Sequence, residues 1–331
     1  MTYSFLLIGA GSIGQRHARN LVQLGETLGG VFNPSPEKAR QISQASGAEA
    51  FTSIEKAFEK AGNYDAALIC SPNHLHMQHV KLCLSHDLDF FLEKPAFMSS
   101  AGAGPVLKAA AKRRLKTLVG CNMRFNAGFI EFERIVRSGR LGSIVQLLAH
   151  NSSYLPEWRP GTDYLKNYAA KKATGGGILL DGIHEIDYVR ALAGRVSGVS
   201  CLCGTCGGLG IETEDTADVV LMHAGGARSA VHLDYLSRLP ARWVKAIGTE
   251  GAAAYDFISG KAVVRTGLVA AQEQDLHEDR NRMYVREMEH FIRVLDGKEK
   301  SACPLADGLS DVQIADAAKK SSARSGLMVK V

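Results

Sequence analysis

The sequence has 331 residues, of which 46% are hydrophobic and 22% are charged, a balance typical of a folded chain long enough for two domains. Its 39 basic and 34 acidic residues give a formal net charge of +5 without a dense basic patch, so we expect no nucleic-acid partner. The sequence contains neither the roughly 18 consecutive apolar residues of a membrane span nor a signal peptide. We therefore expect a cytoplasmic protein that does not act on membranes.

The seven cysteines are odd in number and mostly scattered, which indicates reduced thiols. The closest group, Cys201, Cys203 and Cys206, has no second Cys or His pair downstream to complete a tetrahedral site. We expect small buried thiols on a strand, and no metal.

Short apolar runs alternate with helical patterns over residues 1–121. The apolar runs cover residues 5–8, 30–32, 66–69, 88–92 and 117–119, and the helical patterns cover 13–24, 36–46, 53–61, 74–85 and 99–114. Such alternation is typical of βαβ units. The sequence therefore predicts an α/β dinucleotide-binding domain over residues 1–121, a doubly wound parallel sheet of the Rossmann type.

After Cys121 the pattern changes to strand-like runs separated by glycine turns. These runs cover residues 143–151, 196–206, 215–224, 229–237, 242–248 and 252–257, and helical patterns cover 127–138, 175–193, 281–296 and 306–323. We expect an α+β substrate-binding domain over residues 122–331, with a largely antiparallel sheet that is open on one face. An open sheet face favours a homodimer or homotetramer.

A glycine-rich motif follows the first apolar run directly. Gly9, Gly11 and Gly14 have the GxGxxG spacing between a strand and a helix that a dinucleotide-binding turn requires. Gly9 permits the tight turn, Gly11 lets the backbone approach a pyrophosphate, and Gly14 allows close helix–strand packing. The helix that begins at Ser12 and Ile13 offers its unpaired N–H groups to the phosphates.

Asn33 stands 33 − 14 = 19 residues after the last glycine, where an acidic residue typically binds the ribose 2′-hydroxyl. An amide bonds that hydroxyl without repelling a 2′-phosphate, so the choice between NAD and NADP stays open. Ser71, Asn73 and His76 follow the 66–69 run, at a strand end where cofactors bind in open α/β sheets. We expect Asn73 to bond a ribose and His76 to lie near the nicotinamide, unless His76 only begins a helix.

Lys94 follows an apolar run that ends at Leu92, so we expect its amine at the same edge of the sheet. Oxidation of an alcohol requires loss of the O–H proton as hydride leaves carbon. A lysine can bond that oxygen, stabilise the developing alkoxide and accept the proton, and partial burial brings its pKa toward neutrality. We expect Glu93 beside the cofactor as a local charge partner rather than as the base.

A second motif follows a glycine run at residues 175–177. Asp181 and His184 are three residues apart in a predicted helix, so their side chains share a face. His184 is suited to general acid–base catalysis near neutral pH, with Asp181 binding a substrate hydroxyl or orienting the imidazole. Helix capping and packing is the alternative role of this pair. A zincin motif is rejected because Tyr188 stands where it needs a second histidine.

These motifs together resemble those of the glucose–fructose oxidoreductase, inositol dehydrogenase and rhizopine catabolism family of NAD(P)-dependent oxidoreductases, over essentially the full chain. The resemblance implies that Lys94 lies at the site of hydride transfer, that Asp181 and His184 complete the catalytic set, and that Arg124 binds substrate. Two features depart from the family pattern: two residues rather than three separate Asp181 from His184, and Asn33 replaces an acid. The matching segments are residues 9–14, 71–73, 93–95, 122–125 and 175–187.

The short Asp-to-His spacing, together with the aromatic segment 154–168, resembles a subgroup associated with surface-polysaccharide and nonulosonic-acid sugar pathways. Its tyrosines and Trp158 are suited to stacking on a sugar ring, and its basic residues to a carboxylate or phosphate. We expect Arg159 and Tyr164 to contact substrate, the alternative being a structural loop or an oligomer contact.

The sequence thus predicts an NAD(P)-dependent dehydrogenase that transfers hydride between nicotinamide and a hydroxyl-bearing carbon of a small sugar, sugar derivative or cyclitol. Two alternatives remain. One is a glycosidase that uses the nicotinamide transiently, and the other is a dinucleotide-binding sensor without catalysis.

Overall fold

The computed structural model describes residues 2–331, which form two compact units. The first contains the chain up to Asn122 together with Tyr284–Leu309, and the second contains Met123–Met283 and Ser310–Val331. We expected everything after residue 121 in the second domain. Residues 284–309 instead return to the first unit, where Phe291 packs against Phe5 and Phe91 with ring centroids 6.3 and 6.0 Å apart.

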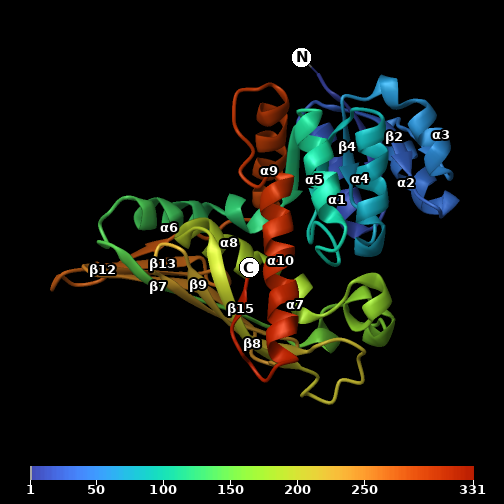
Figure 1. Cartoon of the computed structure of the whole chain (residues 1–331). Coiled ribbons are helices and arrows are strands. Elements are labelled where there is room, and N and C mark those ends of the chain that lie inside the picture. The colour runs from blue at the N-terminus through green and yellow to red at the C-terminus, as the bar shows by residue number, and fades with distance from the viewer. Residues whose placement is uncertain (1) are drawn as a thin grey trace. The chain divides into compact units, whose positions relative to one another are not determined.

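The first unit is built on a six-stranded parallel sheet in the order β3-β2-β1-β4-β5-β6 (Figure 1). The predicted strands are confirmed, and the residues of β1 and β4 in particular are nearly all fully buried. The strands are β1 (Ser4–Ile8), β2 (Thr27–Phe32), β3 (Glu49–Phe51), β4 (Ala66–Ile69), β5 (Asp89–Glu93) and β6 (Thr117–Gly120).

The direction of the connections places the helices on both faces of this sheet. From β1 the chain first moves to β2 and β3 and then returns to β4, β5 and β6 on the other side. Because such crossovers are right-handed, the helices of the two halves cover opposite faces. The helices are α1 (Ser12–Gln23), α2 (Pro36–Ser46), α3 (Ile54–Glu59), α4 (His76–Ser85), α5 (Ala103–Lys112) and α9 (Asn281–Leu295), with 3₁₀ turns η1 (Ala61–Asn63) and η2 (Asn73–Leu75).

The second unit is built on a nine-stranded sheet in the order β14-β13-β12-β11-β7-β10-β9-β8-β15. Its strands pair antiparallel except β7 and β10, which are parallel. They are β7 (Ile144–Ser152), β8 (Val196–Gly204), β9 (Thr216–His223), β10 (Arg228–Asp234), β11 (Ala241–Gly248), β12 (Gly251–Asp256), β13 (Lys261–Thr266), β14 (Gln272–Asp275) and β15 (Val329–Lys330).

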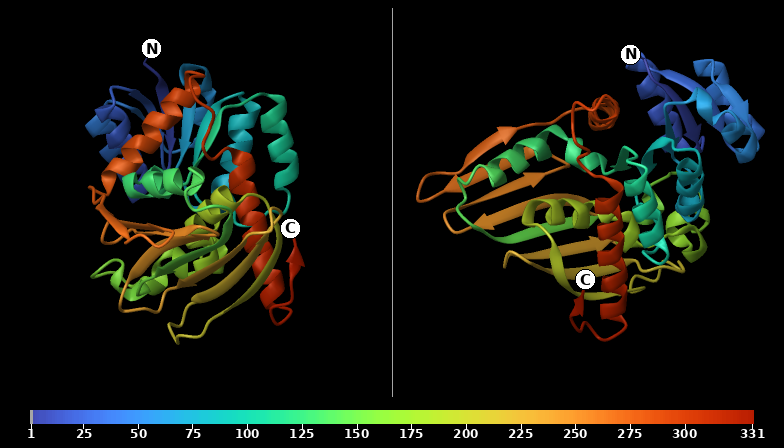
Figure 2. Two further views of the ribbon diagram at one scale, coloured as in Figure 1. Left: turned by 90° about the vertical axis from the view of Figure 1, so that its left-hand side faces the viewer. Right: turned by 45° about the horizontal axis from the view of Figure 1, so that its top comes forward.

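One face of this sheet carries the helices of the second unit, as Figure 2 shows. Helix α8 packs on β7 and β10, and α6 packs on β12 and β13. Along β9 buried and more exposed residues alternate, which is typical of a sheet covered on one side only. The helices are α6 (Ala127–Arg137), α7 (Ile178–Asp181), α8 (Ile183–Ala193) and α10 (Leu305–Ser322), after the 3₁₀ turn η3 (Asn122–Phe125).

Four strands of residues 2–331 lie outside the predicted runs: β3, β13, β14 and β15. β13 contains three consecutive apolar residues, whereas β3 and β14 carry little apolar patterning. β3 has three residues, two of them exposed, and all four residues of β14 are exposed. The predicted strand of buried thiols is also only partly correct, because Cys201 is buried whereas Cys206 is exposed beyond the end of β8.

The helix predicted over residues 175–193 is two helices that meet at Gly182. A Cβ at this position would lie 2.9 Å from both the Ile178 carbonyl oxygen and a methyl of Leu233 on β10, so glycine is required for the close approach. Among the helices of residues 2–331, none is both long and apolar enough to span a bilayer.

Candidate active site

The predicted cofactor residues of the first unit share one edge of the parallel sheet. They follow the carboxyl ends of β1, β2, β4 and β5, four adjacent strands of the sheet. The strand order reverses between β1 and β4, and ligands of open α/β sheets bind at such a switch point. The residues are Gly9, Gly11, Ser12, Ile13, Gly14, Asn33, Ser71, Asn73, His76, Glu93 and Lys94.

The glycine loop is closed so tightly that side chains do not fit. Gly9 has φ +108°, and a Cβ there would lie 2.6 Å from the Cys70 carbonyl oxygen. A Cβ on Gly14 would lie 2.0 Å from the Gly9 carbonyl oxygen. Gly11, by contrast, faces open space and begins α1 without a side-chain cap, so the helix N-terminus can receive a phosphate.

Asn33 supports this loop with its side chain. Its Oδ1 accepts a hydrogen bond from the backbone N–H of Ala10 at 3.1 Å, and its Nδ2 donates to the Ser35 carbonyl oxygen at 3.4 Å. The amide at the end of β2 therefore ties the glycine loop to the segment that begins α2.

His76 connects the two loops that follow β4 and β5. Its ring is fully buried, with Nδ1 2.9 Å from the Pro95 carbonyl oxygen and Nε2 2.9 Å from the Ser71 carbonyl oxygen. Burial lowers the pKa of His76, although both carbonyl bonds oppose this. The Ser71 hydroxyl lies 2.8 Å from Nδ1 of His79. Both ring nitrogens of His76 thus bond the backbone, and they hold the turn after Lys94.

Glu93 and Lys94 end β5 beside this turn. A carboxylate oxygen of Glu93 lies 2.6 Å from Nε2 of the buried His17 on α1, and the other accepts the backbone N–H of Lys94 at 3.2 Å. Lys94 itself is half-buried. Its amine is therefore carried by a backbone segment that a buried hydrogen bond between His17 and Glu93 fixes.

In the second unit, two phenols hold the carboxylate of Asp181. Tyr168, in the 3₁₀ turn η6 (Tyr168–Ala170), donates its hydroxyl proton to Oδ1 at 2.6 Å, and Tyr235 donates to Oδ2 at 3.2 Å. Asp181 ends α7, and His184 is buried in the first turn of α8. Burial, and then the nearby Asp181, raise the pKa of Tyr235 well above its usual range, so its phenol stays a donor.

Tyr235 is absent from the sequence-based site because it lies 54 residues from Asp181 along the chain. It follows β10, whose parallel pairing with β7 is the exception in this sheet. Trp158 packs edge-on against Tyr235 at 5.3 Å and donates its indole N–H to Ser153 at 2.9 Å. The aromatic segment 154–168 therefore reaches the site directly through Tyr168, which bonds Asp181, and indirectly through Trp158.

The other predicted substrate residues lie in different surroundings. Arg159 is exposed, and Tyr164, in η5 (Tyr164–Lys166), donates its hydroxyl to the Leu209 carbonyl oxygen at 2.9 Å. Arg124 contacts Asp187 through two nitrogens, with Nε 2.6 Å from Oδ2. Since this guanidinium is mostly buried, its geometry favours support of α8 over contact with substrate.

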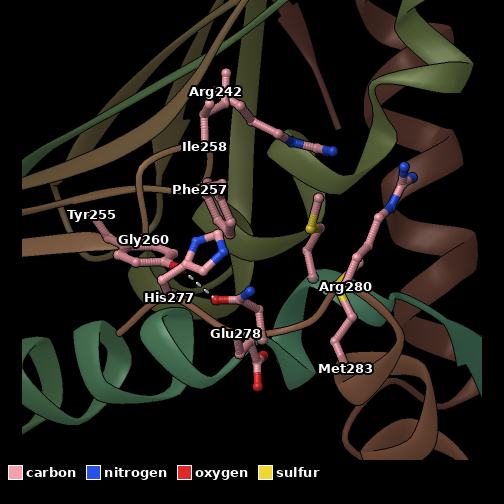
Figure 3. A pocket seen from close by; sticks show the side chains of 11 residues that line it. Arg242, Tyr255, Phe257, Ile258, Gly260, His277, Glu278, Arg280 and Met283 are labelled. Carbon is pink, nitrogen blue, oxygen red and sulfur yellow. Dashed lines mark hydrogen bonds between the residues drawn. The ribbon is translucent and has the colours of Figure 1, made fainter. Parts of the chain in front are cut away.

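A pocket of about 330 Å³ lies elsewhere in the second unit (Figure 3). Tyr255 and Phe257 contribute aromatic surface, and Arg242 pairs with the buried Glu185 of α8 at 2.8 Å. Neither Asp181 nor His184 lines this pocket. It is therefore separate from Asp181 and His184, although Met123 of the 122–125 segment lines it.

Comparison with known families agrees with this geometry. The profile of the "Oxidoreductase family, NAD-binding Rossmann fold" matches residues 3–121, and that of the "GFO/IDH/MocA C-terminal domain" matches residues 129–254. The chain belongs to the GFO/IDH/MocA family of oxidoreductases. As a member of this family it is an oxidoreductase with an NAD-binding domain.

Relatives cover nearly the whole chain. Inositol 2-dehydrogenase of Rhizobium meliloti (strain 1021) is 27% identical over 98% of both proteins. Myo-inositol 2-dehydrogenase of Thermotoga maritima is 27% identical over 95% of both. The same fold occurs in levoglucosan dehydrogenase in complex with NADH and levoglucosan, with TM-score 0.91 and 18% identity over 100% of this chain and 99% of that one. The WlbA dehydrogenase from Bordetella pertussis, in complex with NADH and UDP-GlcNAcA, has TM-score 0.83 and 21% identity over 100% and 99%.

Proposed function

We propose that this protein transfers hydride between the nicotinamide of NAD and a hydroxyl-bearing carbon of a sugar, sugar derivative or cyclitol. The observation that carries the proposal is the position of Lys94. It follows β5, at the sheet edge that also bears the glycine loop of this NAD-binding domain. Bound NAD supplies the hydride acceptor.

In the proposed mechanism, Lys94 bonds the substrate hydroxyl and takes its proton as hydride leaves carbon. An ammonium beside the developing alkoxide stabilises charge that is absent from the ground state, which lowers the barrier. We assign His184 the role of exchanging that proton, and Asp181 the role of fixing a neighbouring substrate hydroxyl. The bonds from Tyr168 and Tyr235 support this role, because they hold the carboxylate in one orientation.

The relatives and the site together support the proposed substrate class. The named relatives act on inositol, and one dehydrogenase of the same fold holds a nucleotide-linked sugar acid. Polyols need several fixed hydrogen-bonding groups, which Asp181, His184 and Tyr168 supply. We assign Arg159 and Tyr164 to the outer part of the substrate site, where a guanidinium suits a carboxylate or phosphate.

We also propose that the helix-free face of the large sheet joins two copies of this chain. Leu202, Val220 and Met222 alternate with buried residues on β8 and β9, and their exposed fractions are 61%, 41% and 37%. Burial of such an apolar stripe against a second copy removes it from water. Light scattering after size-exclusion chromatography tests this, because Val220→Glu should yield monomers and an unchanged mass would contradict it.

The experiment that tests the activity is nicotinamide absorbance after mixing the protein with NAD and a panel of sugars, cyclitols, sugar acids and nucleotide-linked sugars. A substrate-dependent rise in NADH is the expected result. Cleavage of a glycoside without net NADH would replace the dehydrogenase by a glycosidase. Tight NAD binding with no reaction on any compound would favour a sensor.

A further inference from the structure

Three buried titratable residues lie behind the cofactor edge of the first unit, and the proposed function uses none of them as a catalytic group. They are His17 on α1, Glu93 at the end of β5 and Glu287 on α9. The exposed fractions are 0% for His17, 9% for Glu93 and 0% for Glu287. Buried carboxyl groups are costly unless they are paired or protonated, so this cluster requires an explanation.

His17 already bonds one of the two carboxyl groups. Its Nε2 lies 2.6 Å from Oε1 of Glu93, a separation typical of an imidazole N–H that donates to a carboxylate. In the neutral ring Nδ1 then carries a lone pair. Within residues 2–331, Nδ1 is buried and has no hydrogen-bond partner.

Glu287 is the second group that lacks a partner. Both of its carboxyl oxygens are buried without a hydrogen bond in the described part of the chain. Tyr284 and Phe291 occupy the same face of α9 at spacings i−3 and i+4. Tyr284 lies 6.0 Å from the His17 ring, and Phe291 lies 6.0 Å from Phe91, which itself lies 4.9 Å from His17. Glu287 therefore faces the neighbourhood of His17.

The protonation states are complementary. Burial, and then the charge of Glu93, raise the pKa of Glu287 well above its usual range, so its carboxyl is neutral and has an O–H to donate. Burial likewise keeps the Cys70 thiol neutral and lowers the pKa of His76. The guanidinium of Arg16 lies over the ring of Tyr284 at 4.7 Å. The protonated carboxyl of Glu287 thus supplies a donor beside the unpartnered Nδ1 of His17.

We propose that Glu287, one bridging water molecule, His17 and Glu93 form one buried hydrogen-bonded chain that positions the Glu93–Lys94 segment. The O–H of Glu287 donates to the water, the water donates to Nδ1 of His17, and the Nε2–H of His17 donates to Glu93. Glu93 in turn accepts the backbone N–H of Lys94 at 3.2 Å. Helix α9 thereby fixes the strand end that carries the amine. The inference rests on the role proposed for Lys94, and all three are positioning residues.

Two variants separate positioning from packing. Glu287→Gln keeps a neutral donor in nearly the same volume, whereas Glu287→Met keeps the volume and removes the donor. Glu289→Gln changes a half-buried glutamate on the same helix and serves as the control. Glu287→Met removes a buried carboxyl but also leaves Nδ1 of His17 without its proposed donor, so we expect its thermal midpoint to fall slightly while the chain still folds.

The first readout is infrared spectroscopy of the full chain at neutral pH, without substrate. We expect the absorption of protonated carboxylic acids to be equal in the wild type and Glu289→Gln and to lose the contribution of one carboxyl in Glu287→Gln, while the contribution of the buried Asp311, whose pKa burial also raises, stays. Equal absorption in the wild type and Glu287→Gln would overturn the proposal, because Glu287 would then be ionised.

The second readout is the rate at which acetic anhydride labels Lys94, followed by mass spectrometry across pH. Glu287→Met should change this rate at neutral pH by about threefold or more, equivalent to a half-unit pKa shift, while Glu287→Gln and Glu289→Gln leave it unchanged. An unchanged rate in Glu287→Met would refute positioning. If the catalytic role of Lys94 were wrong, Lys94→Ala would still oxidise sugars. The infrared and labelling results would then stay as predicted, so the two failures can be told apart.

Discussion

The predicted site residues of the first unit and those of the second unit are positioned by different means. In the first unit, strand ends and a glycine loop place the predicted cofactor residues. Lys94 is placed because it follows the last residue of β5. In the second unit, hydrogen bonds between side chains far apart in sequence place Asp181, from Tyr168 on one side and Tyr235 on the other. Backbone placement leaves a motif in the sequence, whereas side-chain placement does not.

The largest expected effect comes from a change in the glycine loop, which the backbone places. Gly14→Val should abolish NAD binding, because even a Cβ would lie 2.0 Å from the Gly9 carbonyl oxygen and the loop must open. Titration of NADH fluorescence measures this directly. Gly62→Val is a matched control, since a Cβ at Gly62 meets nothing within 4 Å. Unchanged NADH affinity in Gly14→Val would contradict the loop assignment.

The next effect concerns Arg124, which supports α8 in the second unit. Arg124→Ala leaves the buried Asp187 short of a partner and should lower the free energy of unfolding by about 3–5 kcal/mol. Burial alone would raise the pKa of Asp187, but Arg124 and Arg190 lower it overall. This contribution is therefore present above the unfolded pKa of about 3.9 and is lost as pH falls through the folded pKa.

Urea unfolding at neutral and acidic pH measures this prediction. The difference between the wild type and Arg124→Ala should shrink as the solution becomes acidic. Arg134→Ala is the control, because Arg134 forms an exposed pair with Glu131 on α6. Equal losses in the two variants would show that the Arg124–Asp187 pair carries no special stability.

A smaller effect distinguishes the two phenols that hold Asp181. Tyr168→Phe should cost more activity than Tyr235→Phe, because its bond is 2.6 Å against 3.2 Å. One such hydrogen bond to a charged group contributes about 1.5–3 kcal/mol, so we expect a loss of roughly tenfold or more for Tyr168→Phe. Steady-state kinetics on the substrate found in the panel measures both. A wild-type kcat/KM in Tyr168→Phe would show that the Tyr168 hydroxyl does not contribute to catalysis.

The smallest effect concerns Asn33, which follows a strand end and also holds the glycine loop with its side chain. Asn33→Asp keeps the acceptor for the Ala10 N–H and adds a charge that repels a 2′-phosphate. The ratio of NADPH to NADH dissociation constants should rise about tenfold, the change that about 1.4 kcal/mol produces. Fluorescence titration with both cofactors measures the ratio, and an unchanged value would show that Asn33 serves only the loop.

The same contrast explains what the sequence predicts and what it does not. The parallel strands, the glycine loop and the placement of Lys94 follow from apolar runs and motif spacing, because local backbone geometry dictates them. The return of α9 to the first unit depends on aromatic contacts of Phe291 with residues about 200–290 positions earlier, which no local pattern reveals. The break at Gly182 depends on the proximity of Leu233, and the role of Tyr235 depends on sheet pairing.

Arg124 and His76 show a further difference between a residue type and its role. Both suit ligand binding chemically, yet one pairs with Asp187 and the other bonds two backbone carbonyls. Their partners come from segments brought together only by the fold. A motif therefore identifies which residues matter more reliably than what each one does.

The central claim is that Lys94 transfers the proton while NAD accepts hydride, and Lys94→Ala tests it most directly. On the substrate identified in the panel, kcat should fall by about 10²–10⁴-fold, the range of a general acid–base group, while NADH binds as tightly as to the wild type. Retention of wild-type kcat in Lys94→Ala would contradict the account.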